Sequence, residues 1–250
     1  MRPDADWILP QWPAAARVHG LVTTRNGGTS APPFDTFNLG MHLDDDPAAV
    51  LANRERLRAY LPAEPCWLRQ VHGTRVVDAL DEAKVAEADA CVATQSNRVC
   101  AVLVADCLPV LLCDRAATTV AAAHAGWRGL SAGVLENTVA AMRCRPQELL
   151  AYLGPAIGPD AFEVGADVLE AFARTDPGAA SCFRAATASA SLEPKWFADL
   201  YELARRRLAR LGITTVFGGG LCTYRDRARF FSHRRDKRTG RQAALIWLSA

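Results

Sequence analysis

Residues 99–130 read VCAVLVADCLPVLLCDRAATTVAAAHAGWRGL, and this stretch decides the fold class. It contains short apolar runs without the alternation of apolar and polar residues that a half-exposed strand shows. Such runs, bounded by turn residues, are typical of strands that are buried on both faces. The predicted strands of the whole chain are 99–105, 109–113, 118–123, 149–153 and 213–217.

Three segments carry helical patterns. Asp46-Pro47 supplies an N-cap and a first residue for a helix that Pro62 ends. Residues 196–211 form an amphipathic pattern that a glycine terminates, and 130–143 has apolar residues at helical spacing. Strands and helices therefore mix along the chain, which predicts the α/β class.

Composition sets the limits within which a function must be sought. The chain has 250 residues, half of them hydrophobic, and no repeat, low-complexity segment or linker divides it, so we expect one domain over 1–250. No apolar run is long enough for a membrane span, and the N-terminal residues do not resemble a signal peptide. The eight cysteines contain no CxxC pair, and most of them are expected to be reduced core thiols. We therefore expect a cytoplasmic protein that does not bind a membrane.

Basic residues gather in the last fifth of the chain, at 205–210 and 233–241. A basic tail is one feature of nucleic-acid binding. However, the net charge is only +2, and we favour a solvated helix face for the first run. For the second run we favour phosphate contacts or surface salt bridges, so no nucleic-acid partner is expected.

The residues that suggest chemistry are His72, Cys107 and His124, each at the end of a predicted element next to a turn. Taken singly, a lone histidine is more often structural and a cysteine in an apolar run is more often a core residue. Together they supply two imidazoles and one thiolate, which is a known ligand set for catalytic zinc with an open fourth position. Their sequence separations are not diagnostic.

Several motifs resemble those of the YfiH family, whose members are classed as laccase-like polyphenol oxidases. In chain order they are TTRNGG with PFDTFNLG, RQVHG, LVADCLPVLLCD, HAGWRG and GGGLCTYRDRARFFSHRRDKRTGR. The resemblance implies a single domain of layered mixed β-sheets flanked by helices, similar to the catalytic domain of cytotoxic necrotizing factors. It also implies a zinc ion held by His72, Cys107 and His124. One departure is His233, where the family pattern has a tyrosine.

The resemblance further implies purine nucleoside chemistry. The expected reactions are phosphorolysis of adenosine, inosine and methylthioadenosine to the free base and a ribose 1-phosphate, together with deamination of adenosine. An open zinc site suits both, since it can lower the pKa of bound water to ~7 or hold an anionic phosphate. The usual zinc-deaminase signature, HxE with PCxxC, is absent.

Six further residues are candidates for this chemistry. Asp106, beside Cys107, is either an acid/base group or a residue that orients a metal ligand. Asn38 and Gln70 have amide ends that suit a purine or ribose edge, although Asn38 could equally be a turn residue. Phosphate requires cations, and the candidates that the family pattern would gather near the metal are Arg25, Arg128 and Arg225.

Two other functions stay open. A true multicopper laccase needs on the order of ten histidines to hold its copper ions, and this chain has five. Two histidines and one cysteine do match a single copper site, so weak copper-dependent oxidation is one alternative. The other is a metal-free hydrolase that uses Cys107 and His124 as a dyad, in which case His72 is dispensable.

Overall fold

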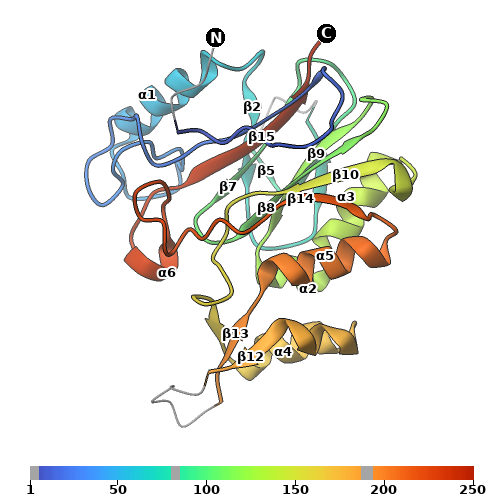
Figure 1. Cartoon of the computed structure of the whole chain (residues 1–250). Coiled ribbons are helices and arrows are strands. Elements are labelled where there is room, and N and C mark those ends of the chain that lie inside the picture. Colours follow the sequence, from blue (N-terminus) through green and yellow to red (C-terminus); the bar gives the residue numbers. More distant parts are fainter. Residues whose placement is uncertain (1–5, 80–84, 187–193) are drawn as a thin grey trace.

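The protein is built around two β-sheets that pack face to face (Figure 1). The computed structural model describes residues 6–79, 85–186 and 194–250. The four-stranded sheet has the order β1 (Val18–Val22), β15 (Gln242–Leu248), β7 (Val99–Val104) and β2 (Pro65–Cys66). The six-stranded sheet has the order β14 (Thr215–Gly218), β10 (Leu149–Leu153), β8 (Leu108–Asp114), β9 (Val120–Ala125), β6 (Ala90–Ala93) and β4 (Val76–Asp78).

Both sheets are mixed. Most neighbouring strands run antiparallel, while β2 runs parallel to β7, β4 to β6 and β14 to β10. The β8–β9 pair places Leu108 opposite Ala125 and Pro109 opposite His124. The start of β8 therefore lies beside the end of β9, where these two central strands of the six-stranded sheet end on the same side.

Each central strand is buried on both faces, which explains the unbroken apolar runs of the sequence. In β9, Val120 and Ala122 belong to the core between the two sheets, whereas Ala121 and Ala123 belong to the core on the other side. Successive side chains of a strand point to opposite faces, so both sets must be apolar. The unbroken apolar runs thus reflect strands that pack against another layer on each of their two faces.

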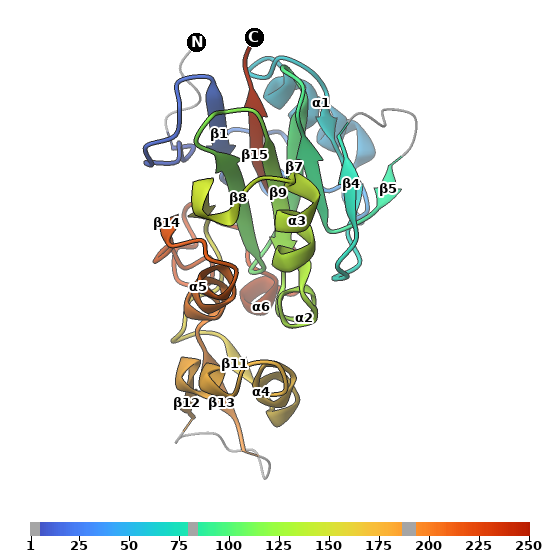
Figure 2. The same ribbon diagram turned by 90° about the vertical axis from the view of Figure 1, so that its right-hand side faces the viewer.

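Helices provide this cover (Figure 2). Leu57 of α1 (Pro47–Arg58) packs in one core with Ala101 and Leu245 of the four-stranded sheet. The six-stranded sheet is covered by α2 (Trp127–Ala132), α3 (Val134–Met142) and α5 (Leu200–Arg210). The result is a four-layer α/β/β/α arrangement, which confirms the α/β class with mixed sheets and flanking helices.

The predicted elements are confirmed in kind, with two corrections. The 130–143 helix is two helices, because Gly133 between α2 and α3 has a φ of 105° and interrupts the helical path. The 196–211 helix begins later: Trp196–Ala198 form strand β13, and the Asp199 side chain then caps the N-terminus of α5. The Asp46 cap of α1 is as predicted.

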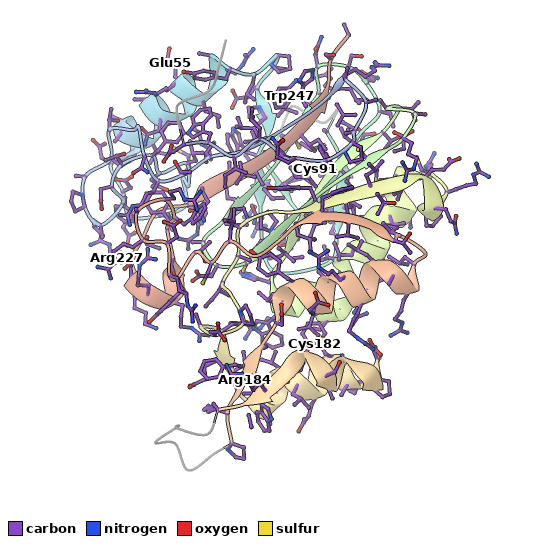
Figure 3. All side chains as sticks on the ribbon, in the orientation of Figure 1. Glu55, Cys91, Cys182, Arg184, Arg227 and Trp247 are labelled. Atoms are coloured by element: carbon purple, nitrogen blue, oxygen red, sulfur yellow. The ribbon has the colours of Figure 1, made fainter. Side chains whose placement is uncertain are left out.

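A small unit lies at one end of the molecule and was not predicted. It comprises the three-stranded sheet β11 (Glu163–Val164), β13 and β12 (Phe183–Ala185), with α4 (Ala166–Ala173) and the 3-10 helix η2 (Pro177–Cys182). Figure 3 shows Cys182 and Arg184 of this unit at the opposite end from Glu55 of α1. The remaining short elements are β3 (Leu68–Arg69), β5 (Ala86–Glu87), η1 (Pro146–Glu148) and α6 (His233–Asp236).

All eight cysteines are free thiols, as the sequence predicts for most of them. None of the helices in the described parts of the chain has the length and apolar character that crossing a membrane requires. The extent of a single domain over 1–250 and the similarity to cytotoxic necrotizing factors stay predictions.

Candidate metal centre and its pocket

The chain crosses from one sheet to the other at the centre of the site. Strand β7 of the four-stranded sheet ends at Val104, and β8 of the six-stranded sheet begins at Leu108. Cys107 lies at the end of this crossing, where Asp106 has a φ of 90° that turns the chain sharply. His124 is the second-last residue of β9, and His72 lies in the loop after β3. The three predicted ligands therefore meet at one edge of the sandwich.

Their side chains form a compact cluster. The ligand atoms of His72, Cys107 and His124 all lie within 4.8 Å of one another. His72 Nε2 is 3.7 Å from Cys107 Sγ, and the two imidazole rings meet edge to face with centroids 4.8 Å apart. Zinc bound at ordinary bond lengths separates a thiolate sulfur from an imidazole nitrogen by about 3.5 Å. The donor set and its spacing fit a single metal ion.

Asp89, directly before β6, holds two of the three candidate ligands. It is fully buried, and His124 Nδ1 lies 2.8 Å from its Oδ1. The same carboxylate accepts hydrogen bonds from the backbone N–H groups of Val71, His72 and Gly73. With Nδ1 occupied in this way, His124 is left with Nε2 for a metal ion.

Two glycines leave room for the cluster. A Cβ at Gly126 would stand 2.9 Å from Cys107 Sγ and 2.9 Å from Cδ2 of His72. A Cβ at Gly129 would stand 2.7 Å from the carbonyl oxygen of Gly73. The glycines of the HAGWRG motif therefore let α2 approach the loop that carries His72.

Cys107 and His124 strongly shift each other's pKa. Burial raises the pKa of Cys107, but His124 and then His72 outweigh it and lower the pKa to about 6. Burial lowers the pKa of His124, but the charge of Cys107 and the hydrogen bond to Asp89 raise it to about 9. Without a metal, the pair is thus a thiolate beside an imidazolium near neutral pH.

A pocket of about 750 Å³ opens over the cluster, which is a volume typical of small-molecule sites. His72 is exposed and Cys107 is half-buried, so both are accessible from it. Its wall combines apolar, aromatic and basic side chains. Besides the three clustered residues, the lining includes Met41, His42, Arg54, Trp67, Arg69, Gln70, Val85, Leu103, Arg128, His233 and Arg241.

Two of the six further candidates lie in this pocket. Arg128 is exposed, and its guanidinium stacks over Trp127 at 4.3 Å from the ring centroid. Gln70 also lines the pocket, but both ends of its amide are engaged. Its Nε2 donates to Leu103 O, and its Oε1 accepts from Leu103 N, at 2.8 Å each. Gln70 therefore pairs with the backbone of β7.

Asp106 and Asn38 lie outside the pocket lining, and their side chains bond to other parts of the chain. The Asp106 carboxylate accepts hydrogen bonds from Thr223 Oγ1 and Arg234 N, both at 2.6 Å, and so fixes the C-terminal segment. Asn38 is fully buried, with its oxygen accepting from Gly40 N and Arg241 N. Both side chains make hydrogen bonds within the protein, and neither is among the residues that line the pocket.

Arg25 and Arg225 are not brought to the cluster either. Arg25 donates to the carboxylate and the carbonyl oxygen of Asp35 and lines a different cavity. Arg225 is exposed and forms an ion pair with Asp160. In both cases a nearby aspartate, not a phosphate site, explains where the guanidinium lies.

Sequence reasoning missed Asp89 and Arg54 and did not place His42. Arg241 belongs to the basic run 233–241, for which phosphate contacts were one of two interpretations, but it was not singled out as a site residue. Asp89 carries no signal beyond its place before an apolar run, and the basic residues come from segments far apart in the chain. His233 does lie at the pocket, where its Nδ1 is 2.7 Å from the carbonyl oxygen of Lys237.

The fold and the site define a class of protein: an α/β sandwich whose pocket ends on a His/Cys/His cluster suited to one metal ion. Within that class, the chain belongs to the YfiH family. The family model described as "Multi-copper polyphenol oxidoreductase laccase" matches residues 19–249.

Related sequences match this chain over almost its whole length. A purine nucleoside phosphorylase of Pseudomonas aeruginosa is 54% identical over 243 residues, which cover 97% of this chain and 98% of the relative. The purine nucleoside phosphorylase YfiH of Escherichia coli is 52% identical, with coverage of 96% and 98%.

Solved structures also match this chain over almost its whole length. A Neisseria meningitidis protein of the DUF152 family superposes with a TM-score of 0.92 at 51% identity, covering 98% of this chain and 99% of that one. YlmD from Geobacillus stearothermophilus gives a TM-score of 0.89 at 30% identity, with coverage of 100% and 98%.

Proposed function

We propose that this chain is a zinc-dependent purine nucleoside phosphorylase. It would cleave adenosine, inosine and methylthioadenosine with phosphate, giving the free base and a ribose 1-phosphate or its methylthio form, and it would also deaminate adenosine. The observation that carries the proposal is the cluster of His72, Cys107 and His124 at the base of a pocket of about 750 Å³. Relatives that are half identical to it are named purine nucleoside phosphorylases.

The residues around the cluster suit the binding of a metal ion. Asp89 fixes the ring of His124, and Gly126 keeps the space beside Cys107 and His72 clear. A zinc ion bound here would supply a Lewis acid with an open position for water or a phosphate oxygen.

The pocket wall supplies the binding groups. Arg128 carries a charge that no acidic side chain among the described residues neutralises, which suits an anionic substrate group. Trp67, Met41 and Val85 give the wall an apolar portion against which a purine ring could pack. Asp106 acts as a positioning residue in this proposal, because both of its carboxylate oxygens hold other segments.

Two other functions have specific support. The matching family is described as a laccase, and two imidazoles with a thiolate suit copper, which favours weak oxidation of phenols. The low pKa of Cys107, about 6, suits a nucleophilic thiolate and favours a metal-free hydrolase. Metal dependence separates all three functions.

The deciding experiment incubates the purified protein with adenosine or inosine, with and without phosphate, and separates the products by chromatography. We expect phosphate-dependent release of free base that chelation abolishes and zinc restores. His124→Ala should lose this activity, while His19→Ala should retain it, since His19 stacks on Trp247 away from this pocket (Figure 3 labels Trp247).

The alternatives predict different results. A copper oxidase would oxidise phenols only after copper is added and would release no base. A thiol hydrolase would keep its hydrolytic activity after chelation and after His72→Ala. It would lose that activity in Cys107→Ser. Either pattern would overturn the proposal.

A further inference from the structure

We propose that His42, Arg54 and Arg241 form a subsite for a tetrahedral phosphate-class anion in the wall of the pocket. All three side chains line the same pocket as His72 and Cys107. They come from the loop before α1, from α1 itself and from the residue just before β15, so only the fold brings them together. The choice of inorganic phosphate as the occupant rests on the proposed function.

Arg54 is a cation on which the charge of Glu64 acts but with which no described carboxylate forms an ion pair. Its Nε and Nη2 both donate to the carbonyl oxygen of Leu39, at 3.0 and 2.9 Å, and its guanidinium lies 4.0 Å from the ring centroid of Trp67. No carboxylate among the described residues pairs with it, and Nη1 has no partner there. Burial lowers the pKa of Arg54 to about 10, although the charge of Glu64 opposes this. A partly buried cation of this kind favours an anion beside it.

Arg241 has the same character. Its Nη1 donates to the carbonyl oxygens of Thr239 and Gly240, at 3.0 and 2.9 Å. In the described part of the chain, its Nε and Nη2 meet no partner and its guanidinium meets no carboxylate within ion-pair distance. Burial lowers the pKa of Arg241 as well, against the charges of Cys107 and Asp106. Free N–H groups on a planar guanidinium match the oxygens of a phosphate.

One segment holds the three basic groups in place. Asn38 Oδ1 accepts from Arg241 N, Leu39 N donates to Arg241 O, and Leu39 O accepts from Arg54. His42 follows in the same segment. All three side chains line the same pocket. Partial burial lowers the pKa of His42, and the charges of Arg241 and then Arg54 lower it further. Asn38 thus builds the subsite without lining the pocket.

The chemistry favours a phosphate over a carboxylate. Two guanidinium groups and an imidazole supply several N–H donors, which a tetrahedral oxyanion can accept on separate oxygens. Such an anion could be free inorganic phosphate or the phosphate of a nucleotide. We infer free phosphate, because phosphorolysis needs it as a second substrate.

The test is calorimetric titration of the zinc-loaded, full-length protein with inorganic phosphate at constant 0.15 M salt. Loss of hydrogen bonds to a charged group should weaken the phosphate affinity of Arg241→Gln and of Arg54→Gln about tenfold or more. The matched control is Arg69→Gln, which should stay within about twofold of wild type. Arg69 lines the same pocket, but Glu87 already neutralises its charge.

Titration with AMP and with adenosine identifies the source of the phosphate. One outcome is that inorganic phosphate does not bind, while AMP binds more tightly than adenosine and Arg241→Gln removes this difference. The subsite would then take a nucleotide phosphate, and our choice of free phosphate would be wrong. If phosphate affinity is unchanged in both Arg241→Gln and Arg54→Gln, or is lost only in Arg128→Gln, the subsite itself is refuted. Thermal unfolding of each variant excludes a folding defect.

These measurements involve no turnover. The proposed activity can therefore fail while phosphate still binds in an Arg241-dependent manner. Conversely, phosphorolysis that persists in Arg241→Gln with an unchanged KM for phosphate would refute the subsite and leave the activity standing.

Discussion

Asp89 and His124 form a buried pair in which Nδ1 of the imidazole lies 2.8 Å from the carboxylate. The backbone N–H groups of Val71, His72 and Gly73 donate to the same carboxylate, so one anion fixes candidate ligands from two distant segments. Hydrogen bonds of this kind orient a ligating histidine and set which nitrogen faces the metal. The pair is the main support of the candidate centre.

Replacing Asp89 by asparagine should lower zinc affinity about 10- to 100-fold. The amide oxygen can still accept one hydrogen bond, but the NH₂ group would face backbone N–H groups that need an acceptor. Competition with a zinc-binding chelator measures the change. Asp160→Asn serves as the control, because Asp160 is an exposed partner of Arg184 and Arg225. Equal zinc affinity in Asp89→Asn and wild type would show that Asp89 has no role in the centre.

Gly126→Ala should disrupt the cluster with little effect elsewhere. The new methyl group would lie 2.9 Å from both Cys107 Sγ and His72 Cδ2, closer than real Cβ contacts allow. We expect weaker zinc binding and a loss of activity of at least tenfold, since displacement of about 1 Å in a reacting group can cost ~100-fold. Zinc content after dialysis is the readout. Ser131→Ala, in the same helix, should keep its zinc.

In metal-free protein, Cys107 should react with iodoacetamide at unusually low pH. Its pKa is lowered to about 6, so the thiol is protonated below pH 6 and the reactive thiolate accumulates as pH rises through 6. Buried Cys113, whose pKa is raised to about 12, should stay unmodified throughout. Mass spectrometry of labelled peptides gives the profile. A midpoint near the ordinary thiol value of about 8.5 would contradict the thiolate–imidazolium pair. Zinc should protect Cys107.

Arg207→Ala should lower the free energy of unfolding by about 2 kcal/mol, through lost hydrogen bonds to a charged group. Although it lies in the basic run 205–210, Arg207 is 8% exposed. It pairs with Glu136 of α3 and donates to Ser131 O and Thr175 Oγ1. Chemical denaturation measures the loss. Arg210→Ala, at an exposed position, should cost less than about 1 kcal/mol. Equal effects of the two changes would contradict this role.

The sequence determined the layers of the fold and the identity of the three candidate ligands. Apolar runs such as 99–105 and 149–153 specify strands buried on both faces, because burial is recorded residue by residue along a strand. The Asp46-Pro47 start of α1 was equally readable, since capping is a local interaction. The prediction that His72, Cys107 and His124 gather at one point needed the family resemblance as well as their residue types.

Only the tertiary structure decided which polar residues surround the cluster. Arg25, Arg225, Asn38 and Asp106 have side chains that suit a phosphate, a purine or a proton transfer, yet each is bound to another part of the chain. Arg54 carries no local signal, and Arg241 has only its place in the basic run 233–241, but both line the pocket because α1 and the residue before β15 contribute to its wall. The residue type sets the charge and the hydrogen-bonding groups of a side chain. Whether those groups bond to other parts of the chain or stay available to a ligand depends on long-range contacts, which no local pattern specifies.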